Sequence, residues 1–193
     1  NNANQYVVIE FINPTSYVKW KDAKNKYYIR KITFHTPSYH NVGVVDVRKP
    51  VFPITSTTVV APAVRSETAG PNSNCMEIEF MCSMDIPTGD NIVISVLCKY
   101  PTTSDDALKN SFRPINRYLA DVNKNQLLLG GYRDSKYEFS CKDLFPKRKT
   151  FYEYNGTTFK TNSSGNLKNV TRIVFEDSIQ IPVEFYNNIK RLT

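Results

Sequence analysis

The sequence lacks the features typical of a membrane-spanning protein, a coiled coil or a nucleotide-binding enzyme. No apolar run approaches the ~20 residues that a membrane-spanning helix requires. No tandem repeat, heptad pattern, phosphate-binding loop or paired-cysteine metal motif is visible. The first residues, Asn1 to Gln5, resemble neither a signal peptide nor a transit peptide. We therefore expect membrane association only through a segment outside this chain.

The chain does contain enough apolar and aromatic side chains for a folded core. Its 193 residues are 40% hydrophobic and 12% aromatic, which fits a single domain over residues 1–193. Short runs rich in β-branched and aromatic residues predict strands. These runs are residues 6–11, 17–20, 27–34, 75–83, 91–100, 151–158 and 169–175. The nearly continuous apolar run Ile92–Leu97 predicts a central strand buried on both faces.

Two helices and one turn are predicted from local signals. Residues 104–119 form the best helix candidate, with Ser104 as the N-cap and Pro114 limiting the length. Residues 183–192 place apolar side chains at helical spacing. Residues 24–26, Lys-Asn-Lys, predict a turn before the strand that contains His35.

Residues 41–74 predict a long irregular loop. The segment carries Pro50, Pro53, Pro62 and Pro71 among many Ser, Thr and Val residues. Long loops are uncommon in compact domains and are usually functional or mobile. The segment is either a tolerated insertion or a partner-binding loop, since apolar pairs such as Val51-Phe52 must be buried somewhere.

Two regions of the sequence resemble the α-carbonic anhydrases. Ile32 to His40 is similar to the family segment hydrophobic-His-Phe-His-Thr-Pro-Ser-Glu-His, and Met76 to Cys82 is similar to the family strand Ala-Glu-Leu-His-Leu-Val-His. Four C-terminal segments follow the order and approximate spacing of the family's closing motifs: 143–146, 151–157, 169–175 and 179–182. The resemblance implies a mainly β (α+β) fold with a central twisted, mostly antiparallel sheet and a few short peripheral helices. The family's N-terminal segment has no counterpart before Tyr6.

The departures from the family pattern concern the zinc site. The resemblance implies three histidine ligands, and here these degenerate zinc-ligand positions are Thr33, His35 and Glu79. The positions around these ligands are degenerate as well. Tyr39 stands where the family has an acidic residue, and Glu77 lies near Glu79, a ligand position that is no longer histidine. Catalytic zinc requires three protein ligands and one open position. We therefore expect no metal, no cofactor, no catalytic residue and no carbonate dehydratase activity: a pseudoenzyme.

Three functions remain open at this point. The first is a zinc-less binding or adhesion module that recognises an acidic polysaccharide or a protein partner. The second is a structural subunit of a larger assembly. The third is a CO2-hydrating zinc lyase with a rearranged site completed by His40 or Glu77. Strand parity argues against Glu77 in that role, and we expect His40, after Pro37-Ser38, to point away.

The net charge of +7 raises the question of an acidic partner. No nucleic acid is expected. The simplest interpretation of the scattered cations is a solvated surface. The alternative is a polyanion groove whose candidate contacts are Lys147, Arg148, Lys149, Lys190 and Arg191.

Cysteines and sequons bear on the compartment. Four cysteines allow three full pairings that the sequence cannot separate. Three asparagines begin an Asn-x-Ser/Thr triplet and are possible N-glycosylation sites: Asn155, Asn162 and Asn169. An even cysteine count and these triplets favour a secreted or cell-surface glycoprotein, with an organelle lumen, as part of a complex, as the alternative.

Overall fold

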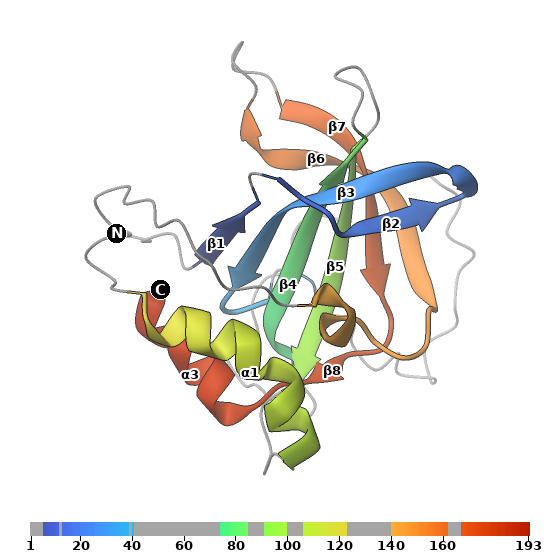
Figure 1. Cartoon of the computed structure of the whole chain (residues 1–193). Coiled ribbons are helices and arrows are strands. Elements are labelled where there is room, and N and C mark those ends of the chain that lie inside the picture. The colour runs from blue at the N-terminus through green and yellow to red at the C-terminus, as the bar shows by residue number, and fades with distance from the viewer. Residues whose placement is uncertain are drawn as a thin grey trace, which may run out of the picture.

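The chain folds around one twisted β-sheet with two α-helices against one of its faces (Figure 1). The computed structural model describes residues 6–11, 13–38, 40, 74–84, 91–99, 106–122, 140–161 and 167–193. The elements in chain order are β1 (Tyr6–Glu10), β2 (Tyr17–Trp20), β3 (Asp22–His35), β4 (Asn74–Ser83), β5 (Asn91–Lys99), α1 (Asp106–Ala120), the 3-10 helix η1 (Cys141–Leu144), β6 (Phe151–Thr161), β7 (Leu167–Phe175), β8 (Ile179–Gln180) and α3 (Val183–Leu192).

The sheet is mostly antiparallel, which confirms the predicted fold class. Its strand order is β1-β3-β4-β5-β7-β6, with β2 paired to β3 and β8 paired to β5. Only the pairings of β5 with β7 and with β8 are parallel among the described strands. Neither helix of the described part of the chain is long and apolar enough to cross a membrane.

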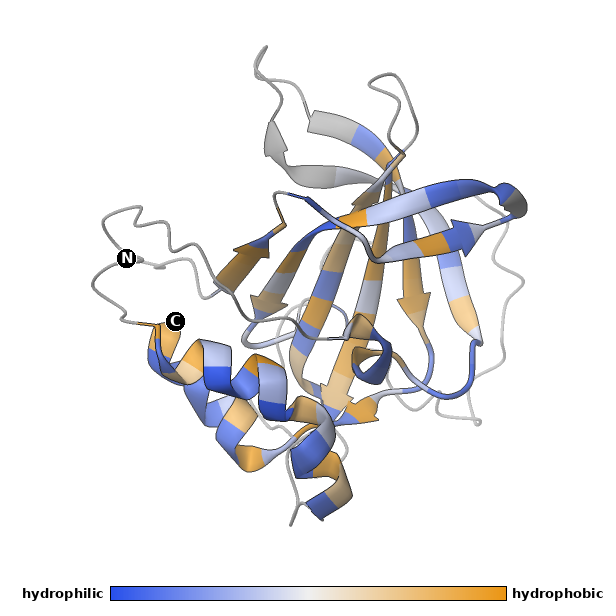
Figure 2. Cartoon of the chain, in the orientation of Figure 1, coloured by the Kyte–Doolittle hydropathy of each residue, from blue (hydrophilic) through white to orange (hydrophobic). Residues whose placement is uncertain are grey.

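Strand alternation gives the sheet two different faces. On β4, Ile78 and Phe80 are fully buried in the core, while Glu77 and Glu79 belong to the opposite parity and therefore to the opposite face. The helices cover the apolar face, where Phe185 of α3 packs against Phe34 of β3 with ring centroids 5.6 Å apart. Figure 2 shows the alternation of hydrophobic and hydrophilic residues along the strands. One face of the sheet is therefore apolar and packs against the helices, and the other carries buried polar side chains.

Two local predictions were wrong. Residues 24–26 lie within β3, because the chain reverses at Lys21, whose positive φ of 53° allows a tight connection between β2 and β3. Helix α1 confirms the predicted helix over residues 106–119, but the expected limit at Pro114 was wrong, because α1 continues to Ala120 although proline removes a backbone donor. Burial of Phe112, Ile115 and Leu119 on one face of α1 offsets that loss.

The remaining predictions divide into those confirmed and those outside the described residues. Helix α3 matches the predicted helix 183–192, and residues 92–98 of β5 are buried throughout. The predicted loop 41–74 lies outside the described residues except for Asn74, which begins β4, and Ser104 lies outside them as well.

Candidate functional site

The candidate site lies on the polar face of the sheet, opposite the helices. Strands β3 and β4 are antiparallel neighbours in a register that places Thr33 across from Glu79 and His35 across from Glu77. All four residues are buried, with exposed fractions of 7% or less. The fold therefore brings the three degenerate zinc-ligand positions together on one face.

Glu79 forms a buried ion pair with Arg172, a residue of β7. The Nη1 of Arg172 donates to Oε2 of Glu79 at 3.0 Å, and both side chains are 5% exposed. The guanidinium also donates from Nε and Nη2 to the backbone carbonyl of Thr157 on β6, at 3.2 and 2.8 Å. Burial raises the pKa of the Glu79 carboxyl, and the charge of Arg172 offsets part of that effect.

Gly156 gives Arg172 the room to reach Glu79. A Cβ atom at Gly156 would lie 2.7 Å from Cδ of Arg172, closer than carbon atoms tolerate. Strand β5 separates β7 from β4, so the Arg172 side chain spans a neighbouring strand to make the pair. A glycine inside a strand can mark such a close approach.

Glu77 lies fully buried within a hydrogen-bonded network. Its Oε1 is 2.7 Å from Nδ1 of His40, and its Oε2 accepts from the His40 backbone N–H at 3.0 Å and from Oγ of Ser38 at 3.2 Å. Burial by itself would raise the pKa of Glu77, but the hydrogen bonds and charge of His40 outweigh it and lower the pKa to about 2. An ionised carboxylate can only accept, so Nδ1 of His40 carries the proton.

His40 does not point away from the site, contrary to the prediction. Besides contacting Glu77, its ring extends the network outward, with Nε2 2.7 Å from the hydroxyl of Tyr154 on β6. The Tyr154 hydroxyl is thus within hydrogen-bond distance of the ring nitrogen that does not face Glu77. Burial raises the pKa of Tyr154. The turn after Pro37 thus directs His40 back onto the sheet.

His35 is buried beside this network rather than exposed in an open cleft. Its exposed fraction is 4%, and the ring of Tyr6 packs near it with centroids 6.1 Å apart. Burial lowers its pKa from 6.5 to about 4. His35 is therefore neutral at physiological pH.

Solved structures identify the architecture. No protein-family model and no curated protein matches the sequence. The structure is similar to α-carbonic anhydrase from Thermovibrio ammonificans in complex with the inhibitor sulfanilamide, with a TM-score of 0.61 and 16% identity over 99% of this chain and 64% of that one. The chain has the α-carbonic anhydrase fold.

Two further structures support this assignment of the fold. The fungal α-carbonic anhydrase from Aspergillus oryzae aligns with a TM-score of 0.60 and 14% identity, over 98% of this chain and 63% of that one. Dioscorin complexed with ascorbate aligns with a TM-score of 0.56 and 12% identity, over 100% of this chain and 62% of that one. The chain thus spans just under two thirds of the length of each of these structures.

The α-carbonic anhydrase fold separates the predicted polyanion contacts. Lys147, Arg148 and Lys149 are exposed between η1 and β6, whereas Lys190 and Arg191 end α3, and Figure 1 shows these segments far apart. Arg191 donates to the backbone carbonyls of Leu119 and Val122, which ties α3 to the end of α1. The five cations therefore do not form one cluster.

The other predicted residues have separate outcomes. Asn155 and Asn169 are exposed on β6 and β7, whereas Tyr39 and Asn162 lie outside the described residues. All four cysteines are buried free thiols, so the even count does not reflect disulfides. The predicted compartment now depends on the sequons alone and stays a prediction.

Sequence reasoning missed Arg172 and Tyr154 as parts of the site. Arg172 is a cation directly before the apolar run Ile173-Val174-Phe175 of its strand, and a charge in a buried strand requires a partner. That signal was available. The sequence could not identify Glu79 as that partner, because 93 positions separate it from Arg172.

Proposed function

We propose that this chain is a carbonic anhydrase-like binding module that does not hydrate CO2. The observation that carries the proposal is the buried ion pair between Glu79 and Arg172. The resemblance assigns the Glu79 position to a zinc ligand, and here the carboxylate already balances a cation. A binding role follows from a rigid β scaffold that retains exposed loops and a positive charge.

The donors at the three ligand positions do not fit a catalytic zinc ion. Thr33 offers a hydroxyl, which is a poor neutral donor, and Glu79 is engaged by a guanidinium that would repel a divalent cation in the same place. No group of three or more His, Cys, Asp or Glu side chains suited to a metal occurs within the described ranges. His35 alone cannot hold the ion and leave an open position.

Metal content and CO2 hydration test the absence of catalysis directly. We expect purified protein to contain no stoichiometric zinc and to show no hydratase activity after incubation with zinc. Replacing the site with Thr33→His, Glu79→His and Arg172→Met should create zinc affinity, because three imidazoles would then face one another without a competing cation. Stoichiometric zinc with hydration by the unmodified protein would refute the proposal.

For the partner, we propose an acidic polysaccharide. The support is the net charge of +7 together with the exposed Lys147, Arg148 and Lys190. Lys149 and Arg191 already donate to backbone carbonyls, so they are weaker candidates.

Retention on a sulfated polysaccharide column, measured against salt, tests this choice of partner. Lys147→Glu with Arg148→Glu should elute at lower salt than the unmodified protein, because counterion release scales with the number of cations engaged. Lys109→Glu with Arg113→Glu makes the same charge change at exposed positions of α1 that are not predicted contacts, and is the matched control. Unchanged elution of both variants would exclude these residues, and a protein ligand would then be the remaining partner.

A further inference from the structure

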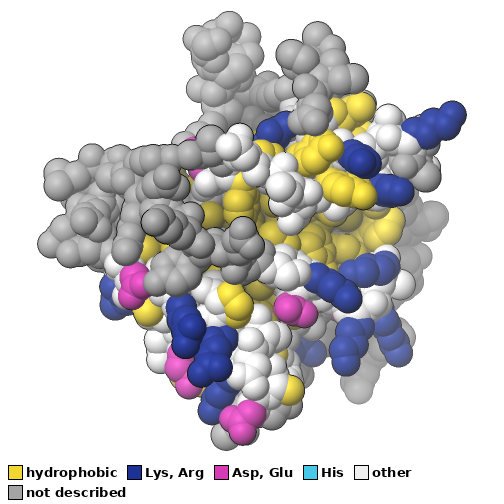
Figure 3. Space-filling view, viewed as in Figure 1, with side chains coloured by type: hydrophobic (Ala, Val, Ile, Leu, Met, Phe, Trp, Pro, Cys, Tyr) yellow, Lys and Arg dark blue, Asp and Glu magenta, His cyan; other side chains and the backbone are white. Residues whose placement is uncertain are grey.

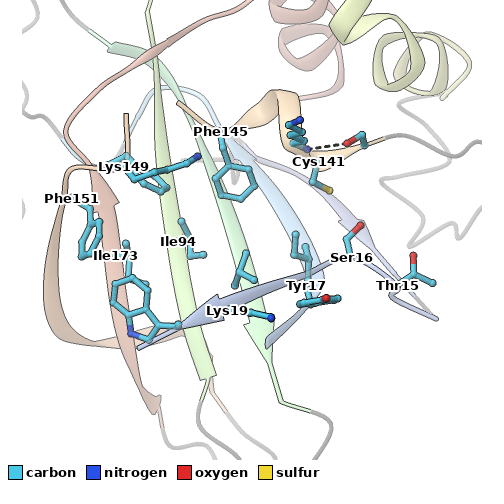
Figure 4. A pocket seen from close by; sticks show the side chains of 16 residues that line it. Thr15, Ser16, Tyr17, Lys19, Ile94, Cys141, Phe145, Lys149, Phe151 and Ile173 are labelled. Atoms are coloured by element: carbon cyan, nitrogen blue, oxygen red, sulfur yellow. Dashed lines mark hydrogen bonds between the residues drawn. The ribbon is translucent and has the colours of Figure 1, made fainter. Parts of the chain in front are cut away.

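An apolar groove lies on the other face of the sheet from the candidate site. Its floor contains Ile94 and Ile173, which alternate with Ser95 and Arg172 of the polar face. The groove has a volume of about 570 Å³, and β2, η1 and the start of β6 border it. Figure 3 shows hydrophobic surface here with Lys and Arg side chains along its border, and Figure 4 shows the lining side chains. Its volume is typical of small-molecule pockets.

Aromatic rings from separate elements form the walls. Trp20 of β2 packs against Phe151 of β6 with ring centroids 5.0 Å apart, and Phe151 lies edge-on to Phe175 at 6.3 Å. Phe151 remains 38% exposed although it is a large apolar side chain. Exposed apolar surface of this kind, held on strands, commonly marks a binding site.

Three lysines and no acidic residue occur among the sixteen residues that line the groove. Lys149 reaches across the wall, with Nζ 5.4 Å from the Phe145 ring centroid and 5.5 Å from that of Phe175. Lys142 lies on η1, also lines the groove and is exposed. On β2, the Lys19 side chain points to the opposite side of the strand from those of Val18 and Trp20, so Lys19 lines only the rim of the groove.

We propose that this groove binds a small amphipathic anion, meaning an apolar body that carries a carboxylate or sulfonate. The apolar body would lie over Ile94 and Ile173 between the aromatic walls. The acidic head would lie toward η1, near Lys142 and Lys149. Charge complementarity carries the choice of an anion, because the lining offers three lysines and no acidic residue around a low-dielectric surface, two of them at η1 and the segment that follows it. Lys149 is the one groove lysine that is also a predicted polysaccharide contact; Lys19 and Lys142 are not.

Two matched dyes test the proposal on the intact protein. Anilinonaphthalene sulfonate carries a charged head, and N-phenylnaphthylamine is nearly the same body without it. We expect the sulfonate to bind more tightly than the neutral amine, and added salt to weaken only the sulfonate. Lys142→Glu should weaken the sulfonate about fivefold and leave the amine unchanged. Trp20→Ala should weaken both dyes, because it removes an aromatic wall.

Lys147→Glu is the control, since it makes the same charge change on a nearby exposed residue that does not line the groove. Cooperative thermal unfolding of each variant excludes dye binding by a loosened core. Lys149→Gln provides a second test of the head site and should also reduce the preference for the sulfonate. Equal affinity for the two dyes, no binding of either, or equal effects of Lys142→Glu and Lys147→Glu would overturn the proposal.

Discussion

Glu77 and Glu79 lie two residues apart on the same face of β4, yet the protein accommodates the two buried carboxylates in different ways. Glu77 faces His40 and Ser38, which supply three hydrogen bonds from a nearby turn. Glu79 faces Arg172, which supplies a full positive charge from β7, two strands away in the sheet. One carboxylate is stabilised locally and the other by a distant part of the chain.

The difference shows in the pKa of each carboxyl. Burial acts to raise both pKa values, but the hydrogen bonds and charge of His40 outweigh it at Glu77, whereas the ion pair with Arg172 offsets it only in part at Glu79. The hydrogen bonds and charge of His40 thus compensate the burial of Glu77 more completely than Arg172 compensates that of Glu79. Glu79 is accordingly the carboxylate that depends most on one residue.

Arg172→Met should cause the largest loss of stability. The substitution retains an apolar stem but leaves the Glu79 carboxylate buried without its cation, a change that typically costs about 3–5 kcal/mol. Urea unfolding followed by circular dichroism measures the loss. The double variant Arg172→Met with Glu79→Met should recover most of it, because replacing both partners of a buried pair is often close to neutral. A double variant no more stable than the single one would show that the Thr157 contacts of Arg172 matter more than its charge.

The stability of the protein should fall in two separate acid windows. His35 has a folded pKa near 4 against an ordinary value of 6.5, so between these values the unfolded chain takes up a proton that the folded protein disfavours. Glu77 has a folded pKa near 2 against 4.5, so its contribution is complete above 4.5 and is lost as the pH falls toward 2. Each difference corresponds to roughly 3 kcal/mol.

Variants separate the two windows. His35→Gln should remove most of the loss of stability between pH 6.5 and 4, while leaving the lower window in place. Glu77→Gln should remove the lower window only. Urea unfolding at a series of pH values is the measurement. A His35→Gln protein that still loses stability across the upper window would assign that loss to another group.

The sheet and its register could be predicted because alternation and local motifs determine them. Thr33 and Glu79 were placed together from strand parity and family resemblance, and the pairing of β3 with β4 bears this out. Helix α3 was visible in the spacing of its buried apolar residues. These features depend on neighbours within one or two elements.

The polar partners could not be predicted because they depend on how distant strands align. Tyr154 is opposite Arg172 in the pairing of β6 with β7, and the parallel pairing of β7 with β5 then sets which carboxylate Arg172 can reach. Pro114 within α1 misled for a related reason, since packing against α3 outweighs a local signal. Lys149 differs from Lys147 through tertiary contacts with two phenylalanine rings and a hydrogen bond to the Pro146 carbonyl.

Tyr154→Phe should have the smallest effect on the free energy of unfolding. It tests which hydrogen bond holds the network around Glu77. The substitution removes one hydroxyl from Nε2 of His40 but leaves the bonds between His40 and Glu77 intact. Tyr154 is 40% exposed, so water can replace the hydroxyl, and the expected loss is at most about 1 kcal/mol. His40→Phe removes the imidazole that Glu77 requires and should cost clearly more. Equal losses for the two variants in urea unfolding would mean that the outer hydrogen bond, and not the His40 contact with Glu77, holds this network together.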